Sequence, residues 1–555
     1  MVYSRIMADE REVTSDESAA AEPVTDWAES TEQVPETEPE ASITTKGDSG
    51  EAGCPIRMDY LSGLRCGRRL HFAPEGGDEK PVCLMHSKDP HKHSGPLFDK
   101  FWREFERILE DAGENVADFD RFVFPHLDLI KRQFEAICRF DHATFTREAD
   151  FSEATFTRGA NFYRASFRGD ANFCEATFAQ DADFRVAAFK QNADFSGAKF
   201  VKAASFSGAT FAGGASFLSA TFSKNAIFPK ATFTQGVGFN DATFAQNANF
   251  YSATFAQMVR FGDTKFGGTA NWRRCRFLDQ VEFRSTSFGS EIAGEPGAVF
   301  VRATFSKPGE TVFDNVDLSR ALFHSCDVSQ VWFTSSVHWN TRKNNRGLAV
   351  FEESIPLGQE FGVRLERDWQ RDYRAVAQIY QQLKKNYDSR LDYWTANEFH
   401  FGEMEMKRLA GPTRGRPLGL RQWLHRNLSL VALYRWASDY GNSYGKPMVW
   451  LLGILLLFAA LLPAPGVGLK RQGAKDTETY VSVWDFQKTY APNLQAEARL
   501  FGKGAITSVD TATFQKSAEY APAYPWGRVL AIFETLLTSS LFALFLLAIR
   551  RQFRR

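Results

Sequence analysis

The stretch "ANFCEATFAQDADFRVAAFKQNADFSGAKF", residues 171–200, decides the fold of the largest part of this chain. It places phenylalanine at six positions whose spacing alternates between five and six residues: Phe173, Phe178, Phe184, Phe189, Phe195 and Phe200. The same eleven-residue period runs from Phe145 to Phe288, with Trp272 in place of one intermediate phenylalanine. A repeat of this regularity has to be explained before any local structure is assigned.

An eleven-residue repeat can indicate a right-handed helical supercoil. On a helix, however, residues six apart lie about 240° around the axis, so the two phenylalanines of each unit would share no stripe. In an extended segment, residues two apart face the same way. Most of these phenylalanines follow an alanine two residues earlier, so both apolar groups would point inward. The pattern therefore predicts a β-solenoid.

The segment "VDLSRALFHSCDVSQVWF", residues 316–333, has a plain five-residue period centred on Leu318, Phe323, Val328 and Phe333. It resembles the pentapeptide-repeat family, whose units centre on Leu or Phe with a small residue two positions before. The resemblance implies a right-handed, four-sided β-helix. The alternation of five and six suggests an extra residue at every second corner, and hence a coil made of two eleven-residue repeats, twenty-two rather than twenty. At about 4.8 Å per coil, residues 145–333 would form a rod roughly 40 Å long.

The expected surface of the solenoid carries no excess charge. Residues 141–340 contain nineteen Asp and Glu and nineteen Lys and Arg. Some proteins of the resembled family imitate DNA with an acidic rod, but a neutral rod is a poor polyanion mimic and binds phosphate poorly. No nucleic-acid partner is therefore expected. Cys138, Cys275 and Cys326 take the small inward position and should be buried.

A group of potential metal ligands precedes the repeats. Cys54, Cys66, Cys83 and His86 offer three thiolates and an imidazole, a usual set for a closed structural zinc site. The spacing in "CLMH", 83–86, is that of a metal knuckle, and a glycine after Cys66 permits a tight turn. We predict one structural Zn²⁺ ion, with His91 and His93 as spare ligands. The alternative is a loop-rich cap with free cysteines.

A helical apolar stripe follows at Phe98, Phe101, Phe105 and Leu109. It should cover the open first coil, because an exposed sheet edge invites aggregation.

Two apolar runs lie near the C-terminus. Val529–Ile549 is 21 residues long, about 31 Å as a helix, which is enough to cross a bilayer. Residues 447–465 are shorter but would reach across if the helix extended to Leu469; a buried core hairpin is the alternative. Basic residues gather at 407–446 and 550–555, so the positive-inside rule predicts a multi-pass protein of the cell (inner) membrane with both termini cytoplasmic.

The fold predicted for the whole chain is a mainly β solenoid followed by helices and a two-helix transmembrane hairpin. Its predicted parts are a disordered acidic tail (1–50), a zinc-binding cap (51–95), a helical cap (96–140), the pentapeptide-repeat β-helix (141–340), a helical hairpin (360–410), a basic interfacial helix (416–446), a first transmembrane helix (447–469), an extracytoplasmic loop (470–527), a second transmembrane helix (528–549) and a basic tail (550–555).

The sequence contains no phosphate loop, nucleophile elbow, HExxH motif or carboxylate pair with a histidine, so no catalytic residue is assigned and no enzyme is predicted. The predicted function is that of a non-enzymatic, membrane-tethered scaffold whose cytoplasmic rod binds a protein of unknown identity. The bilayer is its second partner, and homo-oligomers remain open.

The alternative function is that of an ion-channel-like protein with two transmembrane helices and a cytoplasmic repeat domain. Glu534 lies within a predicted span, where an ionisable residue indicates function by default; it could instead snorkel or be capped by Thr535. Against a channel, no "TxGYG"-like filter lies between the two apolar runs.

Overall fold

The structure is a computed structural model. It describes residues 53–58, 65–71, 73, 77–289, 294–342, 347–355, 373–410, 420–464, 467–471, 479–480, 494–513 and 519–553. These residues belong to one of two units, 50–356 with 371–555; the other unit, 1–49 with 357–370, lies outside the described residues. The predicted acidic tail, 1–50, is therefore not described.

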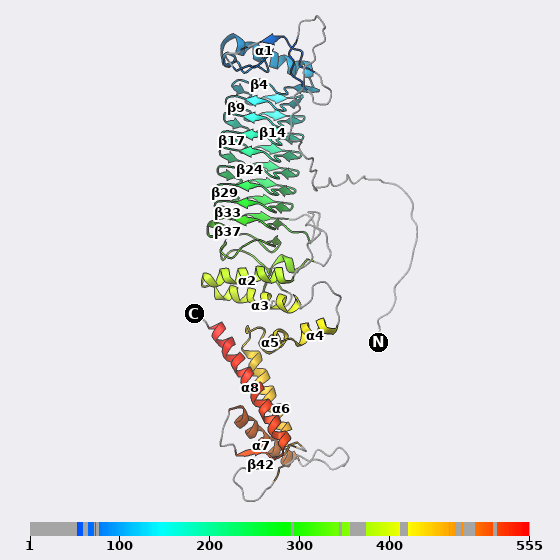
Figure 1. Ribbon diagram of the computed structural model, residues 1–555, viewed down its shortest axis with the longest axis vertical. Coiled ribbons are helices and arrows are strands. Elements are labelled where there is room, and N and C mark those ends of the chain that lie inside the picture. The colour runs from blue at the N-terminus through cyan, green and yellow to red at the C-terminus, as the bar shows by residue number, and fades with distance from the viewer. Residues whose placement is uncertain are drawn as a thin grey trace, which may run out of the picture. The chain divides into compact units, whose positions relative to one another are not determined.

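Short strands stack into four parallel sheets of eight, ten, nine and ten strands (Figure 1). One coil runs through β10 (Thr155–Phe156), β11 (Ala160–Asn161), β12 (Ser166–Phe167) and β13 (Ala171–Asn172), and β14 (Thr177–Phe178) then pairs with β10. The first strands of the four sheets are β3 (Val116–Asp118), β4 (Val123–Phe124), β5 (Leu127–Asp128) and β6 (Gln133–Phe134). The last strands are β34 (Ser287–Phe288), β36 (Thr304–Phe305), β38 (Ala321–Leu322) and β39 (Trp332–Phe333). The predicted β-solenoid is confirmed, but its strands begin at Val116 rather than at 141, so the prediction of a helical cap over 96–140 is wrong beyond Ala112.

The register gives the length of a coil. Thr155 pairs with Thr177 and Phe156 with Phe178, a step of two eleven-residue repeats that recurs through the middle of the stack. Phe313 pairs with Phe333, so the plain five-residue period closes a coil of twenty. The predicted coil of two eleven-residue repeats is correct for the region where five and six alternate.

The core is a set of stacked aromatic columns. The Phe195 ring lies parallel to Phe173 and Phe217, with centroids 4.9 and 5.1 Å away and interplanar angles of 2° and 3°. Trp272 continues one column between Phe250 and Phe300, at 5.6 and 5.0 Å. The three cysteines of the small inward positions are buried, and burial raises the pKa of Cys138 to about 12.

Two of the four corners of each coil are tight turns. In one of them, Ala154 N donates to Phe151 O at 3.0 Å and Glu153 has φ of 56°, which defines a type II turn. Asp150 Oδ1 accepts from Ser152 N at 2.8 Å, which explains the Asp or Asn before many phenylalanines. The left-handed residue recurs every eleven residues from His142 to Ser285. The extra residue of each six-residue step lies in the bends at the other two corners.

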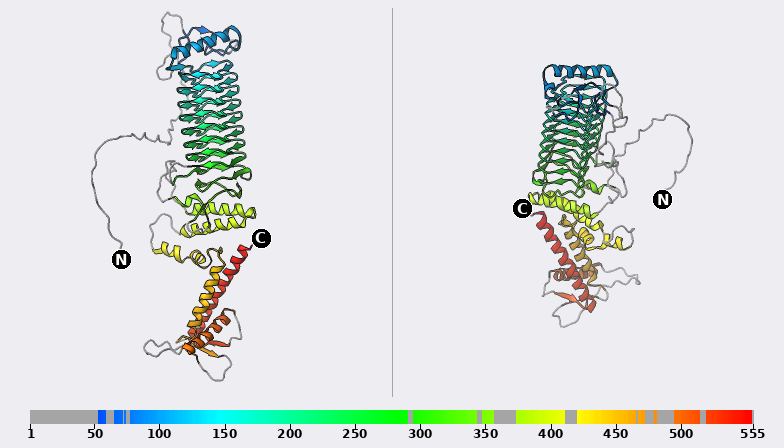
Figure 2. Two further views of the ribbon diagram at one scale, coloured as in Figure 1. Left: turned by 180° about the vertical axis from the view of Figure 1, so that it is seen from behind. Right: turned by 45° about the horizontal axis from the view of Figure 1, so that its top comes forward.

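Both ends of the stack are covered (Figure 2). At the N-terminal end, α1 (Gly95–Ala112) buries Phe101 and Phe105, and the Phe105 ring stacks on Phe119 at 4.8 Å. At the C-terminal end, α2 (Tyr373–Ser389) packs against α3 (Tyr393–Ala410) and contacts the last coil. Asn386 Nδ2 of α2 donates to the backbone oxygens of Val328 and Val331, both at 2.7 Å. Side chains thus satisfy backbone groups that have no further coil to pair with.

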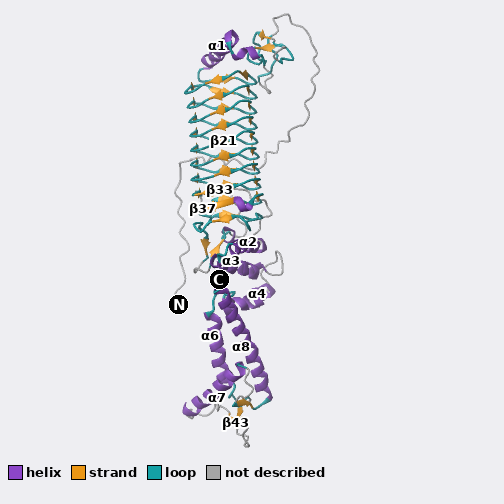
Figure 3. Ribbon diagram, turned by 90° about the vertical axis from the view of Figure 1, so that its left-hand side faces the viewer, coloured by secondary structure: helices purple, strands orange, loops and turns teal. Residues whose placement is uncertain are grey.

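Helices and a small sheet make up the C-terminal part (Figure 3). The helices are α4 (Leu420–Leu428), α5 (Leu430–Ser438), α6 (Gly445–Leu461), α7 (Leu494–Ala512) and α8 (Pro525–Gln552). The strands are β42 (Leu469–Arg471), β43 (Thr479–Tyr480) and β44 (Tyr520–Pro522).

Among the described residues, one helix, Pro525–Arg551, is long and apolar enough to cross a membrane, and α6 is a shorter apolar helix of 17 residues. The predicted extension of the first span to Leu469 is wrong, because α6 ends at Leu461 and Leu469 begins a strand. The two-helix transmembrane hairpin is therefore not established.

The aromatic columns predict the effect of a charge in the core. Phe195→Asp would leave an unpaired carboxylate and a cavity, and should destabilise the solenoid by at least about 3–5 kcal/mol. Lys190→Asp, at an exposed position, should change stability by no more than about 0.5 kcal/mol. Thermal unfolding of the full chain in detergent, followed by circular dichroism, measures both. Equal effects of the two substitutions would contradict the inward placement of Phe195.

Candidate metal centre and membrane junction

Two antiparallel backbone pairs position the predicted metal ligands. Cys54 N donates to Arg68 O, and Cys66 N donates to Ile56 O, both at 2.8 Å, so Cys54 and Cys66 lie on facing segments. Cys83 ends β2 (Val82–Cys83), which pairs with β1 (Leu70–His71). His86 follows in a turn closed by its own N–H, which donates to Cys83 O at 3.0 Å. The structure brings together all four residues.

The ligand atoms of Cys54, Cys66, Cys83 and His86 all lie within 4.8 Å of one another. His86 Nδ1 is 3.5 Å from Cys54 Sγ and 3.1 Å from Cys83 Sγ, and the Sγ atoms of Cys66 and Cys83 are 3.7 Å apart. A zinc tetrahedron with Zn–S bonds of about 2.3 Å has edges of about 3.8 Å. These three distances are close to such edges, so the four side chains could hold one zinc ion after small adjustments, and the cysteines form no disulfide.

The surroundings of the cluster fit a metal ligand set as well. His86 Nε2 lies 3.2 Å from Asp120 O, a partner that leaves Nδ1 facing the thiols and fixes the ring. Gly67 has φ of +63°, and a Cβ on Gly53 would lie 2.4 Å from Gly67 O, so this turn requires two glycines. His91 Nδ1 is bound to Asp89 Oδ1 at 2.9 Å, and neither His91 nor His93 belongs to the cluster.

The cluster is tied to the first coil and to α1. The His86 ring packs edge-on against Phe122 at 5.1 Å, and Val123 N donates to Met85 O at 2.8 Å. Arg68 links the cluster to α1. Its Nη1 lies 3.2 Å from Cys66 Sγ, and its Nε forms an ion pair with Glu104 of α1 at 3.0 Å. A bound metal ion would therefore hold the cap on the N-terminal end of the solenoid.

Metal analysis tests this site. The full chain should carry about one equivalent of zinc, and Cys83→Ala should lose it because three ligands rarely retain a structural ion. Cys138→Ala, which removes a buried cysteine of the solenoid, is the matched control and should keep its zinc. A metal-free wild-type protein that keeps its cap folded would contradict the prediction.

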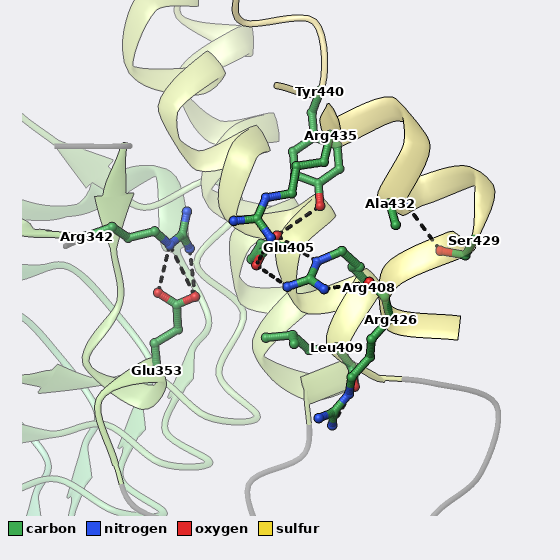
Figure 4. Close-up of polar contacts among 10 residues, drawn as sticks. All are labelled: Arg342, Glu353, Glu405, Arg408, Leu409, Arg426, Ser429, Ala432, Arg435 and Tyr440. Carbon is green, nitrogen blue, oxygen red and sulfur yellow. Dashed lines mark hydrogen bonds and ion pairs between the residues drawn. The ribbon is translucent and has the colours of Figure 1, made fainter. Parts of the chain in front are cut away.

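A second group of polar residues connects α3 with α5 and α8. Figure 4 shows Glu405 of α3 among Arg408, Arg435 and Tyr440. Its carboxylate accepts two hydrogen bonds from Arg408, at 2.6 and 3.1 Å, and one from the Tyr440 hydroxyl at 2.9 Å, and it lies 3.3 Å from Arg435 of α5. Burial acts to raise the pKa of Glu405, but these hydrogen bonds and charges outweigh it and lower the pKa. Arg551 of α8 donates to Tyr440 O at 2.9 Å.

A buried acid lies between this junction and the last coils. Glu352 is fully buried; its Oε1 accepts from Phe323 N at 2.6 Å, and its Oε2 has no hydrogen-bond partner. Burial raises the pKa of Glu352 to about 7. The side chain caps a free backbone N–H of the stack, is about half protonated at neutral pH and is largely protonated below it.

The raised pKa predicts a pH dependence. Between the ordinary glutamate pKa and about 7, the folded state binds a proton that the unfolded state has released, so stability should fall as the pH rises through this range. At 1.36 kcal/mol per pKa unit, the loss between pH 5 and pH 7.5 should be about 2–3 kcal/mol. Glu352→Gln keeps the acceptor oxygen and should abolish this loss, whereas the exposed Glu148→Gln should not. Melting temperatures of the three proteins at pH 5 and pH 7.5 measure it, and a parallel response of all three would disprove it.

Glu534 lies in a polar cluster where α6, α7 and α8 meet. It is fully buried, the Ser508 hydroxyl of α7 donates to its Oε1, and its Oε2 has no partner. The Ser508 oxygen is also 3.2 Å from Leu455 O of α6. Glu534 is thus held by a neighbouring helix, and Thr535 instead donates to Ala531 O at 2.8 Å.

The segment 470–527, expected to be an extracytoplasmic loop, contains a helix, α7, that the sequence analysis did not predict. The signal was present in "FGKGAITS", 501–508, whose small residues permit close helix packing. A Cβ on Gly504 would lie 2.1 Å from Ala459 O of α6. Asn386 and Glu405 were also missed, because a polar residue in an amphipathic helix gives no indication of a distant partner.

Three overlapping segments of the solenoid, residues 140–188, 187–232 and 228–276, match the family model for pentapeptide repeats (9 copies). This part of the chain consists of pentapeptide repeats. No curated protein and no solved structure matched the chain. The match covers residues 140–276 of the solenoid, and it includes neither the first and last coils nor the Cys and His cluster nor the C-terminal helices, so it identifies the repeats and not a partner.

Proposed function

We propose that this protein is a non-enzymatic, membrane-tethered scaffold whose pentapeptide-repeat solenoid presents its faces to another protein. The observation that carries the proposal is the continuous path of buried and partly buried contacts from the last coil to α8. Asn386 binds the last coil, the Glu405 cluster joins α3 to α5, and Arg551 joins Tyr440 to the end of α8. A membrane helix connected in this way would fix the position of the solenoid relative to the membrane, which a flexible linker would not do.

Exposed apolar side chains support contact with lipid. On α4 and α5, Leu430 is 85% exposed and Trp436 67%, and on α8 Trp526 is 76% exposed. The other large apolar residues exposed on these three helices, by 40–62%, are Trp423, Leu424, Leu428, Leu433, Val529, Ile532, Phe533, Leu536, Phe542, Leu546 and Leu547. So many large apolar groups on adjacent helices are unusual for a protein surrounded by water. Tryptophan and leucine beside basic residues are typical of an interfacial helix.

A zinc ion at Cys54, Cys66, Cys83 and His86 has a structural role in this proposal. Bound there, it would supply no chemistry beyond cross-linking the cap. The basic residues at 407–446 support a cytoplasmic position for the solenoid and for both termini, in the inner membrane.

A second candidate is the ion-channel-like function, favoured by one observation. Helix α7 packs against both α6 and α8, and it brings Ser508 next to the buried carboxyl group of Glu534 between the two apolar helices. Ion flux into vesicles that contain the purified full chain distinguishes the candidates. Flux that is lost in Glu534→Ala would favour the channel, and vesicles without flux would favour the scaffold.

Thiol labelling tests the proposed membrane topology. Glu519→Cys, at an exposed position before α8, should react in intact cells with a membrane-impermeant reagent. Cys174, which is partly exposed on the solenoid, should react only after the membrane is broken, and Cys174→Ser gives its background. The opposite pattern would place the solenoid outside and refute the proposed location.

A further inference from the structure

The tight turns at one corner of the solenoid carry acids. The turns of the middle coils at this corner are 152–153, 174–175, 196–197, 218–219, 240–241 and 262–263, each between the fourth strand of one coil and the first strand of the next, and we call them the acidic edge. They contain Glu153, Glu175, Asp241 and Asp263, all exposed, and no basic residue. The turns 130–131 and 284–285 of the flanking coils share the corner and hold Lys131 and Arg284, and Lys131 lies 3.4 Å from Glu153 and offsets part of its charge. The solenoid is neutral as a whole, so this excess must be balanced elsewhere.

The tight turns at another corner carry the balancing charge. The turns that we call the basic edge are 163–164, 185–186, 207–208, 229–230, 251–252, 273–274 and 301–302, and they contain no acid. The turns 120–121 and 141–142 of the first coils share the corner and hold Asp120 and Asp141. On the basic edge, Arg164, Arg185, Lys230 and Arg302 are exposed, Arg274 is half-buried and Arg273 is buried. The guanidinium groups of Arg164 and Arg185 lie over the Tyr163 ring at 5.3 and 5.4 Å, which holds them in place. Asp183 of the adjacent face pairs with Arg185 at 2.7 Å and offsets part of the charge.

The two edges are diagonally opposite. The chain passes the basic edge between the second and third sheets, and the acidic edge between the fourth and first. One copy therefore cannot pair its own edges, but the acidic edge of one copy can face the basic edge of another.

The charges also match in height along the stack. Each acidic-edge turn lies half a coil, about 2.4 Å, from a basic-edge turn above and below it. In this register Glu153 and Glu175 fall beside Arg164 and Arg185, Asp241 beside Lys230, and Asp263 beside Arg274. Both edges are uncharged at the same level, at Gly197 and Ser219 on one and at Ser207 and Gly208 on the other.

We propose that solenoids of two copies of this chain associate side by side, parallel and in register, through the acidic edge of one and the basic edge of the other. This inference rests on the proposed function, because tethering to one membrane keeps the copies parallel and raises their effective concentration. Surface ion pairs are individually weak, so the contact needs both the repetition and the tether. Because the two edges are opposite, each copy keeps one free edge and association continues as a row.

Charge reversal tests the contact. One variant carries Glu153→Lys, Glu175→Lys, Asp241→Lys and Asp263→Lys; another carries Arg164→Glu, Arg185→Glu and Lys230→Glu. Other turns already hold Lys, Arg or Glu at positive φ, so the substitutions suit the backbone. The matched control reverses three exposed lysines at the bend corners, Lys190→Glu, Lys202→Glu and Lys224→Glu.

Donor- and acceptor-labelled full chains are reconstituted together in neutral lipid vesicles at low salt, and energy transfer is measured. Energy transfer in each reversed variant alone should be at least threefold lower than in the wild type. A mixture of the two variants should regain the wild-type transfer, and the control should keep it. A mixture that fails to regain transfer, or absence of transfer in the wild type, would overturn the proposal. Flotation with the vesicles reports tethering separately, so loss of the anchor is distinguished from loss of the contact.

Cross-linking tests the register. Cys174 lies on the acidic edge, half a coil from residue 186 of the basic edge. In the same vesicles a short bifunctional maleimide should join Cys174 to Val186→Cys of a neighbouring copy, and not to Ser252→Cys, three coils away. Equal cross-linking of both would refute an in-register contact.

Discussion

The parallel stacking of phenylalanine rings is the interaction on which the rest of the structure depends. Each ring contacts the ring one coil below and one coil above, at about 5 Å and with nearly parallel planes, so the columns fix the height of every coil. The backbone must return to the same place after every two eleven-residue repeats to preserve this contact, and the tight turns and bends provide that closure. Side chains outside the columns are then free to vary.

A stack of this kind has a problem at its ends, because the first and last coils lack one neighbour. The two ends solve it differently. At the first coil, aromatic residues of α1 continue the columns, and the cysteine and histidine cluster fixes the cap that holds α1 in place. At the last coil, Asn386, Arg390 and Glu352 supply polar groups to the unpaired backbone. The second solution also joins the solenoid to the C-terminal helices.

The solenoid and its coil length could be predicted from the sequence because one rule, an aromatic side chain facing inward at a fixed interval, is repeated many times. The proximity of Cys54, Cys66, Cys83 and His86 could be predicted because few residue types bind zinc and their local spacing is characteristic, and zinc binding itself stays a prediction. The end of α6 could not, since apolar residues continue past Leu461 while the backbone turns toward β42. Nor could the partner of Glu534, because Ser508 is 26 residues away and its role depends on how α7 packs. A repeated pattern and a set of metal-binding residue types can be recognised in a single sequence, whereas contacts between individual residues of different helices cannot.

The left-handed position of the tight turns has a consequence for how such a protein can change over evolutionary time. Glutamate, arginine, valine, serine, lysine and glycine all occupy it along this one solenoid, with φ between about 50° and 70° in each case. The position belongs to the architecture, yet the architecture hardly constrains its side chain. Mutations can therefore change the surface residues of one coil at a time while the core residues stay the same. Solenoids that descend from a single ancestral repeat can in this way acquire different binding surfaces without a change of fold.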